Sequence, residues 1–224
     1  MNIDMFFLSL LNGSDSIFAD ELMIILTNGI TWVGLYLALA FLVIKNNKTV
    51  SQILLIFACA LVCVLLSGIL NDMVFKPLFH RLRPVNDPDV KDMVTVVSGY
   101  YSKGYSFFSS HSANTFSLSI FFTLLTRSKL IGMTLFSWAF INAFTRLYLG
   151  VHWFSDVMAG MVWGLLIGVL AYYLYYKVFY IISPHAKYIS SQYTSTGYSH
   201  NEIDLTVCVY VFTIIYCIIS AVVS

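Results

Sequence analysis

Two side chains with acid–base chemistry, His152 and Asp156, lie four residues apart in a largely apolar chain. On a helix this spacing puts both on one face, where the carboxylate can hold one ring nitrogen and leave the other free. A histidine held in this way can act as a base or as a nucleophile. Arg146 lies just before them, and buried charges in an apolar interior need a partner or a ligand. We therefore expect a site in residues 145–156; the alternative is a polar border at a membrane interface.

A second polar stretch, Lys76–Pro84, contains three cations and a histidine without matching acids. Clustered cations suit an anionic ligand, and the planar guanidinium of Arg83 suits the oxygens of a phosphate. The alternative is that these charges meet lipid headgroups.

A third stretch, Ser109-Ser110-His111, opens an apolar run. Backbone amides at a helix start can bind an anion, and the serine hydroxyls can add donors. His111 could then give a proton to a leaving group, although a histidine at this place can also be a capping or interface residue.

The composition defines the kind of protein that must position these residues. Of 224 residues, 59% are hydrophobic and only 10% are charged, which predicts a polytopic membrane protein. The net charge of +1, with no basic run, argues against nucleic acid as a partner. The four cysteines lie in apolar runs without metal-type spacing, so we interpret them as buried thiols.

Hydropathy predicts an all-α bundle with six transmembrane helices and a short interfacial helix over residues 1–11. Together they would form one integral-membrane domain over residues 1–224. The expected spans are 22–44, which glycines could bend, 52–75, 112–126, 130–148, 153–180 and 205–223, with a polar loop over 184–204. Gly160, Gly164 and Gly168 form a row of small residues along which another helix can pack closely.

Threading these spans puts the ends that carry the three polar stretches on one membrane face. Residues far apart in sequence would therefore meet at one site. The opposite face has Lys and Arg next to span ends in short loops, so the positive-inside rule predicts a site on the extracytoplasmic face of the plasma (inner) membrane.

The three stretches together resemble the signature of the type 2 phosphatidic acid phosphatase superfamily, the integral-membrane lipid phosphate phosphatases. The matching parts are Lys76-x6-Arg83-Pro84, Ser109-Ser110-His111 and Arg146-x5-His152-x3-Asp156, a core signature over 76–156. The resemblance implies that Lys76, Arg83 and Arg146 bind the phosphoryl oxygens, with Ser109 and the backbone near Ser110 completing the cradle. It also implies that His152 attacks phosphorus to form a phosphohistidine, that Asp156 orients His152 and that His111 protonates the leaving oxygen. Three positions depart from the family pattern: Phe108 replaces Pro, Ser110 replaces Gly and Thr145 replaces Ser.

The family works without a metal or other cofactor, so the resemblance implies none here. The expected partner is a membrane lipid phosphate, whose tail would stay in the bilayer near Phe107, Phe108 and Trp153. Among compact bacterial members we expect an undecaprenyl pyrophosphate phosphatase that yields undecaprenyl phosphate; lipid A phosphatases and phosphatidylglycerophosphate or phosphatidic acid phosphatases share the signature.

Two other classes of protein remain open. A transporter or channel would more often have its charges at mid-depth of the bundle. A metallohydrolase using His111, His152 and Asp156 as ligands would bring a divalent metal next to three cations, which would repel it.

Overall fold

A computed structural model describes residues 3–182 and 191–224, and the described residues form helices and loops with a single isolated bridge between Tyr193 and Ser199. The predicted all-α class is thereby confirmed. The α-helices are α1 (Ile3–Leu11), α2 (Ile17–Thr27), α3 (Val33–Asn46), α4 (Val50–Val64), α5 (Lys76–Phe79), α6 (Ser110–Thr126), α7 (Lys129–Tyr148), α8 (Phe154–Ile182) and α9 (His200–Val223).

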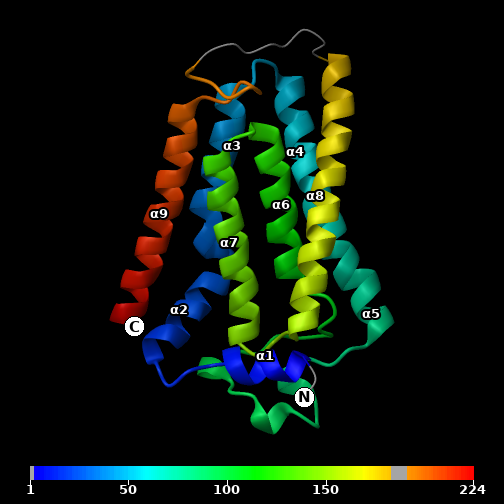
Figure 1. The fold of residues 1–224 in the computed structure, drawn as a ribbon, viewed down its shortest axis with the longest axis vertical. Helices are drawn as coiled ribbons and strands as arrows, with labels where there is room; N and C mark the ends of the chain where they lie inside the picture. The colour runs from blue at the N-terminus through cyan, green and yellow to red at the C-terminus, as the bar shows by residue number, and fades with distance from the viewer. Residues whose placement is uncertain (1–2, 183–190) are drawn as a thin grey trace.

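Helix α6 lies in the middle of the bundle, between α4, α7 and α8 (Figure 1). The row of glycines on α8 explains its close approach to α6, because a Cβ on Gly164 would lie 2.3 Å from the carbonyl oxygen of Ala113. Gly160 meets the carbonyl oxygen of Ser109 in the same way, at 2.5 Å. Only glycine allows this packing, and the packing fixes the start of α6 against the start of α8.

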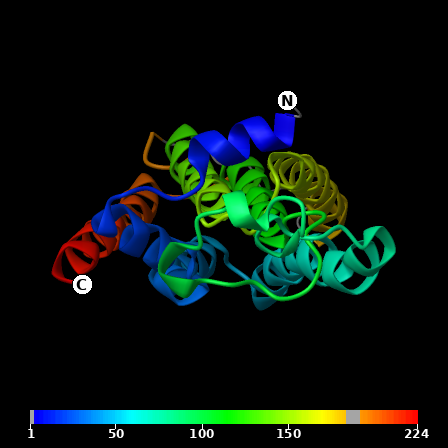
Figure 2. The same ribbon diagram turned by 90° about the horizontal axis from the view of Figure 1, so that it is seen from below.

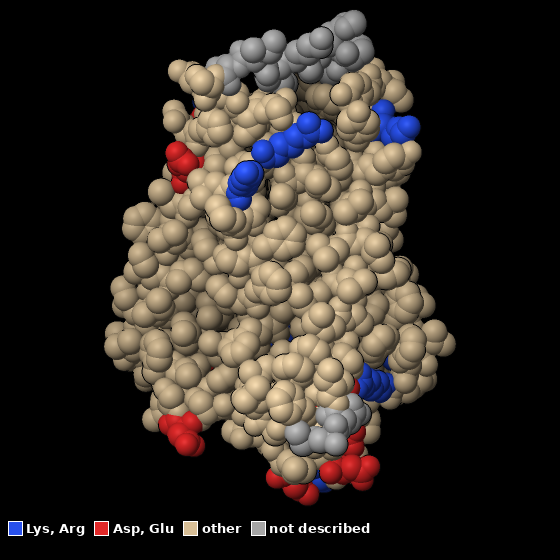
Figure 3. Space-filling view, viewed as in Figure 1, with Lys and Arg blue, Asp and Glu red and all other residues tan. Residues whose placement is uncertain are grey.

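Within the described residues, five helical segments are long and apolar enough to cross a membrane: Gly29–Asn46, Val50–Phe79, Lys129–Tyr148, Phe154–Ile181 and His200–Val223. Helix α6 has 17 residues and many buried serine and threonine side chains, so hydropathy does not mark it as a span. The sixth span stays a prediction. On the face shown in Figure 3, a wide band with few charged side chains separates charged residues at the two ends of the molecule, and each end has both basic and acidic side chains.

The first predicted span, 22–44, is not one helix in the structure. Helix α2 ends at Thr27, and Asn28 caps a 3-10 turn over Gly29–Trp32 before α3 begins. The side chains of Thr31 and Trp32 donate to the carbonyl oxygens of Ile25 and Leu26 in the last turn of α2, at 2.6 and 2.9 Å. These local hydrogen bonds stabilise the break within an apolar run.

The second predicted span, 52–75, continues further than expected. Two π-helical turns, Leu65–Ile69 and Asn71–Phe75, lead into α5, which ends at Phe79. Lys76 therefore lies in a helix and not in a loop.

Helix α1 runs across the end of the bundle, beneath α7 and α8 (Figures 1 and 2). Asn12 at its end donates to the carbonyl oxygens of Tyr148 and Thr95, which fixes α1 to the end of α7. Gly150, with φ of 63°, turns the chain from α7 towards α8 beside Asn12. The placement of α1 in the membrane interface stays a prediction.

The predicted loop 184–204 falls partly outside the described residues, which resume at 191. Residues 200–204 of this predicted loop are helical, because α9 begins at His200. Ser199 caps α9 by accepting a hydrogen bond from the amide of Asn201.

Candidate active site

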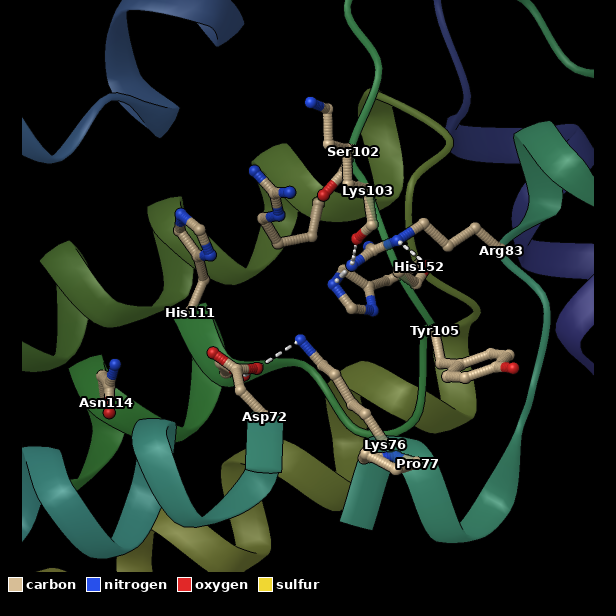
Figure 4. A pocket seen from close by; sticks show the side chains of 13 residues that line it. Asp72, Lys76, Pro77, Arg83, Ser102, Lys103, Tyr105, His111, Asn114 and His152 are labelled. Atoms are coloured by element: carbon tan, nitrogen blue, oxygen red, sulfur yellow. Dashed lines mark hydrogen bonds and ion pairs between the residues drawn. The ribbon is translucent and has the colours of Figure 1, made fainter. Parts of the chain in front are cut away.

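A pocket of about 600 Å³ opens at the end of the bundle that α1 crosses. Six of the eight residues predicted for the site line it: Lys76, Arg83, Ser110, His111, Arg146 and His152. Figure 4 shows Lys76, His111 and His152 reaching this cavity from different elements. Asp72, Pro77, Ser102, Lys103, Gly104, Tyr105 and Asn114 complete its lining.

Lys76 reaches the pocket from α5. Its ammonium group forms an ion pair with Asp72, one helical turn earlier, at 2.6 Å. The side chain of Asp72 is 56% exposed, whereas that of Lys76 is 14% exposed. A ligand in the pocket can therefore reach both charges.

Arg83 is held in a fixed orientation by backbone carbonyl groups. Its guanidinium donates to the carbonyl oxygens of Lys103, Gly104 and Val151 at 3.1, 3.1 and 2.8 Å. Burial, together with the nearby charge of Arg146, lowers the pKa of Arg83 to about 10, so the side chain is still cationic at neutral pH.

Arg146 is 1% exposed and comes from the last turn of α7. One guanidinium nitrogen donates to Thr27 at 2.5 Å and to the hydroxyl of Tyr100 at 3.2 Å. Its buried Nε has no hydrogen-bond partner within the protein. Because an unpaired buried donor is costly, the N–H group at Nε is suited to donate a hydrogen bond to an anionic ligand.

His152 lies in the turn between α7 and α8, 2% exposed. Its Nε2 is 3.0 Å from a guanidinium nitrogen of Arg83, which can only donate. Nε2 is therefore the unprotonated nitrogen, and the proton is on Nδ1. Nδ1 faces a carboxylate oxygen of Asp156 at 3.6 Å, just beyond hydrogen-bond distance, and has no other partner in the protein. Burial and the charge of Arg83 lower the pKa of His152 well below its ordinary value, so the ring is neutral at neutral pH.

Asp156 is fully buried behind His152, outside the lining of the pocket. One carboxylate oxygen accepts from Arg81 at 2.5 Å, and the other accepts from the amide of Trp153 at 3.0 Å. Its own carbonyl oxygen accepts from the amide of Ser109 at 3.0 Å. Asp156 thus joins the starts of α6 and α8.

The two predicted serines differ in their placement. Ser109 caps α6, is fully buried, and its hydroxyl oxygen accepts from Ser112, so its side chain does not line the pocket. Ser110 does line it, and its hydroxyl donates to Asp72 at 2.7 Å and accepts from Asn71 at 2.8 Å. The serine that departs from the family pattern is therefore anchored to the helix that carries Lys76.

His111 occupies the first turn of α6 and faces the same cavity as His152 (Figure 4). Burial and the charges of Arg146 and Lys76 lower its pKa. A dianionic phosphate between these cations would oppose their effect and favour the protonated ring of His111.

Within residues 3–182 and 191–224, no three His, Cys, Asp or Glu side chains form a group that could hold a metal ion. His111, His152 and Asp156, the set considered for a metallohydrolase, do not form such a group. Catalysis without a metal stays a prediction.

Sequence reasoning missed several polar neighbours of the site. Among them are Asp72, which pairs with Lys76, and Thr27 and Tyr100, which hold Arg146. Asp72 lies one helical turn before Lys76, a spacing that could have indicated an ion pair. No sequence signal connects Thr27 or Tyr100 with Arg146, because these residues meet only through the tertiary fold.

A helical bundle with apolar spans, and with four cationic residues and two histidines around one pocket, is the arrangement expected of an integral-membrane protein that binds phosphate groups. Comparison of the sequence with known families finds the pattern of the PAP2 superfamily over residues 53–180. The chain belongs to this superfamily, which confirms the family inferred from the three motifs.

Two curated relatives cover most of the chain. A lipid A 4'-phosphatase of Bacteroides thetaiotaomicron is 34% identical over 178 residues, 79% of this chain and 79% of the relative. A lipid A 4'-phosphatase of Porphyromonas gingivalis is 33% identical over 165 residues, 74% of this chain and 70% of the relative. No solved structure matches the chain.

Proposed function

We propose that this protein is a lipid phosphatase that removes a terminal phosphate from lipid A, with the 4'-phosphate as its first candidate substrate. The observation that carries the proposal is the convergence of Lys76, Arg83, Arg146, His111 and His152 on one pocket. Three cations supply the charge that phosphoryl transfer needs, and two imidazoles supply the nucleophile and the acid.

In the first step, Nε2 of His152 attacks phosphorus and the bond between phosphorus and the lipid oxygen breaks. His111 gives its proton to that leaving oxygen, and the phosphoryl group stays on His152. The proton on Nδ1 of His152 faces Asp156, whose carboxylate stabilises the positive ring in the transition state.

In the second step, water attacks phosphorus while His111, now neutral, takes up a proton from it. The bond between phosphorus and Nε2 breaks, inorganic phosphate leaves, and His152 returns to its neutral form. Arg83 covers Nε2 before substrate binds, at 3.0 Å, so a phosphate must draw this guanidinium to its own oxygens.

The relatives support lipid A over undecaprenyl pyrophosphate, the substrate expected from the motifs, because both are lipid A 4'-phosphatases. An apolar groove of about 460 Å³ supports a lipid substrate in general. Its lining includes Phe75, Phe79, Phe107 and Phe108, which belong to the two segments that also carry Lys76 and Ser110. An acyl chain could lie there while the phosphate occupies the pocket.

We further infer that the chain forms one integral-membrane domain in the inner membrane with its pocket on the extracytoplasmic face. The described basic residues Lys45, Lys48, Arg127 and Lys129 lie in two short loops or at the helix ends beside them, at the opposite end from the pocket. This distribution is the one that the positive-inside rule associates with the cytoplasm.

The test is a panel of substrates given to the purified protein in detergent, with released phosphate as the measurement. The panel contains lipid A with the 4'-phosphate, lipid A without it, undecaprenyl pyrophosphate, phosphatidylglycerophosphate and phosphatidic acid. We expect the fastest release from the 4'-phosphate, with the rate unchanged by a chelator.

The matched control is His152→Ala, which should release no phosphate above background while keeping the elution volume and melting temperature of the folded protein. Release by this variant at the wild-type rate would contradict the nucleophile. Release from undecaprenyl pyrophosphate alone would contradict the lipid A assignment but not the phosphatase.

A further inference from the structure

Arg81 lies behind the active site and bridges two carboxylates from distant parts of the chain. One guanidinium nitrogen donates to Asp156 at 2.5 Å and to the hydroxyl of Ser155 at 2.7 Å. The other nitrogen donates to Asp4 at 2.7 Å. Arg81 also lies over the ring of Trp153, 5.3 Å from its centroid, which fixes the plane of the guanidinium.

Asp4 comes from α1 and is 5% exposed. Its two carboxylate oxygens accept from the amide and from the hydroxyl of Ser155, both at 2.8 Å. Burial acts to raise the pKa of Asp4, but the hydrogen bonds from Ser155 and Arg81 outweigh it and leave the pKa lowered. Asp4 is therefore a carboxylate at neutral pH, and α1 delivers this charge to the start of α8.

Asp156 depends on this arrangement because its carboxylate is fully buried. Arg81 holds one oxygen, and the amide of Trp153 holds the other oxygen, which faces Nδ1 of His152. If Asp156 were the ion-pair partner of Arg81 without Asp4, the guanidinium could move towards Asp156. That movement would rotate the carboxylate of Asp156 away from His152. Asp4 opposes that movement by holding Arg81 from the other side.

We propose that Asp4 and Arg81 are positioning residues that keep Asp156 aimed at Nδ1 of His152, which makes the N-terminal helix α1 part of the catalytic apparatus. The inference rests on the proposed function, since it assigns these residues a part in the same reaction. Neither residue touches the pocket that would hold the phosphate, because neither lines it.

The first test is Asp4→Asn, which keeps the shape of the side chain and removes its charge. Loss of an outer residue that orients a catalytic group typically costs 10- to 100-fold in activity, so we expect kcat to fall about tenfold with KM changed less than twofold. The control is Asp15→Asn, an exposed acid near the same end of the bundle, which should keep the wild-type kcat.

A double-mutant cycle separates positioning from a general loss of packing. Arg81→Lys keeps the positive charge but cannot bridge two carboxylates in one plane, so it should lower kcat by a similar factor. Because Asp4 acts through Arg81, the double variant should be about as active as either single variant. Multiplied losses would contradict a shared action.

A spectroscopic test does not require turnover. Nitrogen-15 and proton NMR of histidine-labelled protein, with His152 assigned from a His152→Gln sample, reports the protonation and the surroundings of Nδ1. We expect the Nδ1–H form in every variant, because Arg83 still donates to Nε2. The Nδ1–H resonances should coincide in the wild type and Asp15→Asn, and should be shifted in Asp4→Asn and Asp156→Asn, where the carboxylate no longer faces Nδ1 in the same way.

The outcomes distinguish this inference from the proposed function. If the wild type releases lipid phosphate and Asp4→Asn has the same kcat and the same Nδ1–H resonances of His152, the positioning role is wrong and the phosphatase stands. If the wild type releases phosphate from no lipid, the proposed function fails, and the NMR spectra alone still decide whether Asp4 orients Asp156 and His152.

Discussion

Arg83 and His152 together show how single residues prepare this site for phosphate. The guanidinium has three carbonyl partners and still donates to the nitrogen that would attack phosphorus. Arg146 keeps a buried Nε without a partner in the protein. Both arginines therefore have a hydrogen-bond direction that a phosphate oxygen can take over without disturbing the rest of the site.

The motifs predicted the residue types of the pocket but not their hydrogen bonds. Lys76, Arg83, Arg146, His111 and His152 could be predicted because charged residues are rare in an apolar chain and match a known spacing. The ring tautomer of His152 could not, because it follows from the direction of Arg83. The placement of Ser109 also could not be predicted, because its hydroxyl serves as a helix cap in competition with any ligand.

The role of His111 leads to a prediction about leaving groups. A lipid alkoxide needs a proton as it leaves, whereas an aryl oxide such as p-nitrophenolate does not. His111→Ala should therefore slow phosphate release from the lipid by about 10²–10⁴-fold and from p-nitrophenyl phosphate by much less. Initial rates on the two substrates give this ratio. Equal losses on both would show that His111 binds phosphate and does not act as the acid.

The lowered pKa of His152 predicts how stability depends on pH. In the unfolded chain the ring of His152 has a pKa of about 6.5. Below that pH the unfolded state binds a proton at this ring, whereas the ring stays neutral in the folded state. The free energy of unfolding should therefore fall as the pH drops below about 6.5, and the stabilisation is fully present above it.

The measurement is the melting temperature in detergent between pH 7.5 and 5.5. The melting temperature of His152→Gln should decrease less than that of the wild type, because the variant lacks a group that is protonated in the unfolded state and neutral in the folded state. His200→Gln, at an exposed position, is the control and should keep the wild-type decrease. Identical slopes for all three proteins would mean that His152 is protonated in the folded state.

At the scale of elements, hydropathy predicted the apolar segments well and their interruptions poorly. The break after Thr27 and the π-helical turns before Lys76 lie within apolar runs, so their causes are hydrogen bonds that hydropathy does not record. The last span was predicted to begin at Leu205, whereas α9 begins at His200. This start could have been predicted, because Ser199 is a favourable capping residue. The short, hydroxyl-rich α6 is buried among other helices, which explains its low hydropathy.

The contact between α6 and α8 gives a prediction about packing. Gly164→Ala would place a methyl group 2.3 Å from a backbone carbonyl oxygen, so the helices must separate. We expect the melting temperature to fall by about 5 °C, with lower activity because the two helices carry His111 and Asp156. Gly29→Ala is the control, since its methyl group would meet nothing within 4 Å. An unchanged melting temperature in Gly164→Ala would contradict the close packing.

At the scale of the whole molecule, the chain connects a catalytic end to an opposite end with basic loops. The polar residues of the pocket come from α5 and the π-helical turn before it, from the segment between α5 and α6, from α6 and α7, and from the turn before α8. All of these reach the same end of the bundle (Figure 1). Because successive predicted spans cross the membrane in opposite directions, the sequence alone was sufficient to infer that these residues meet at one end. The contribution of α1 could not be inferred, since Asp4 meets Arg81 only through the tertiary fold.

The orientation of this molecule in the membrane can be tested with single cysteines. In a Cys208→Ser background, Asp89→Cys places a thiol in the loop near the pocket, and Lys48→Cys places one in a loop at the opposite end. The native cysteines that remain, Cys59, Cys63 and Cys217, are buried. If the pocket faces away from the cytoplasm, a membrane-impermeant maleimide should label position 89 in sealed spheroplasts and position 48 only after lysis, as read from the mass of the protein. Labelling of position 48 in sealed spheroplasts, with position 89 protected, would place the pocket in the cytoplasm and restrict its substrates to lipids of the inner leaflet.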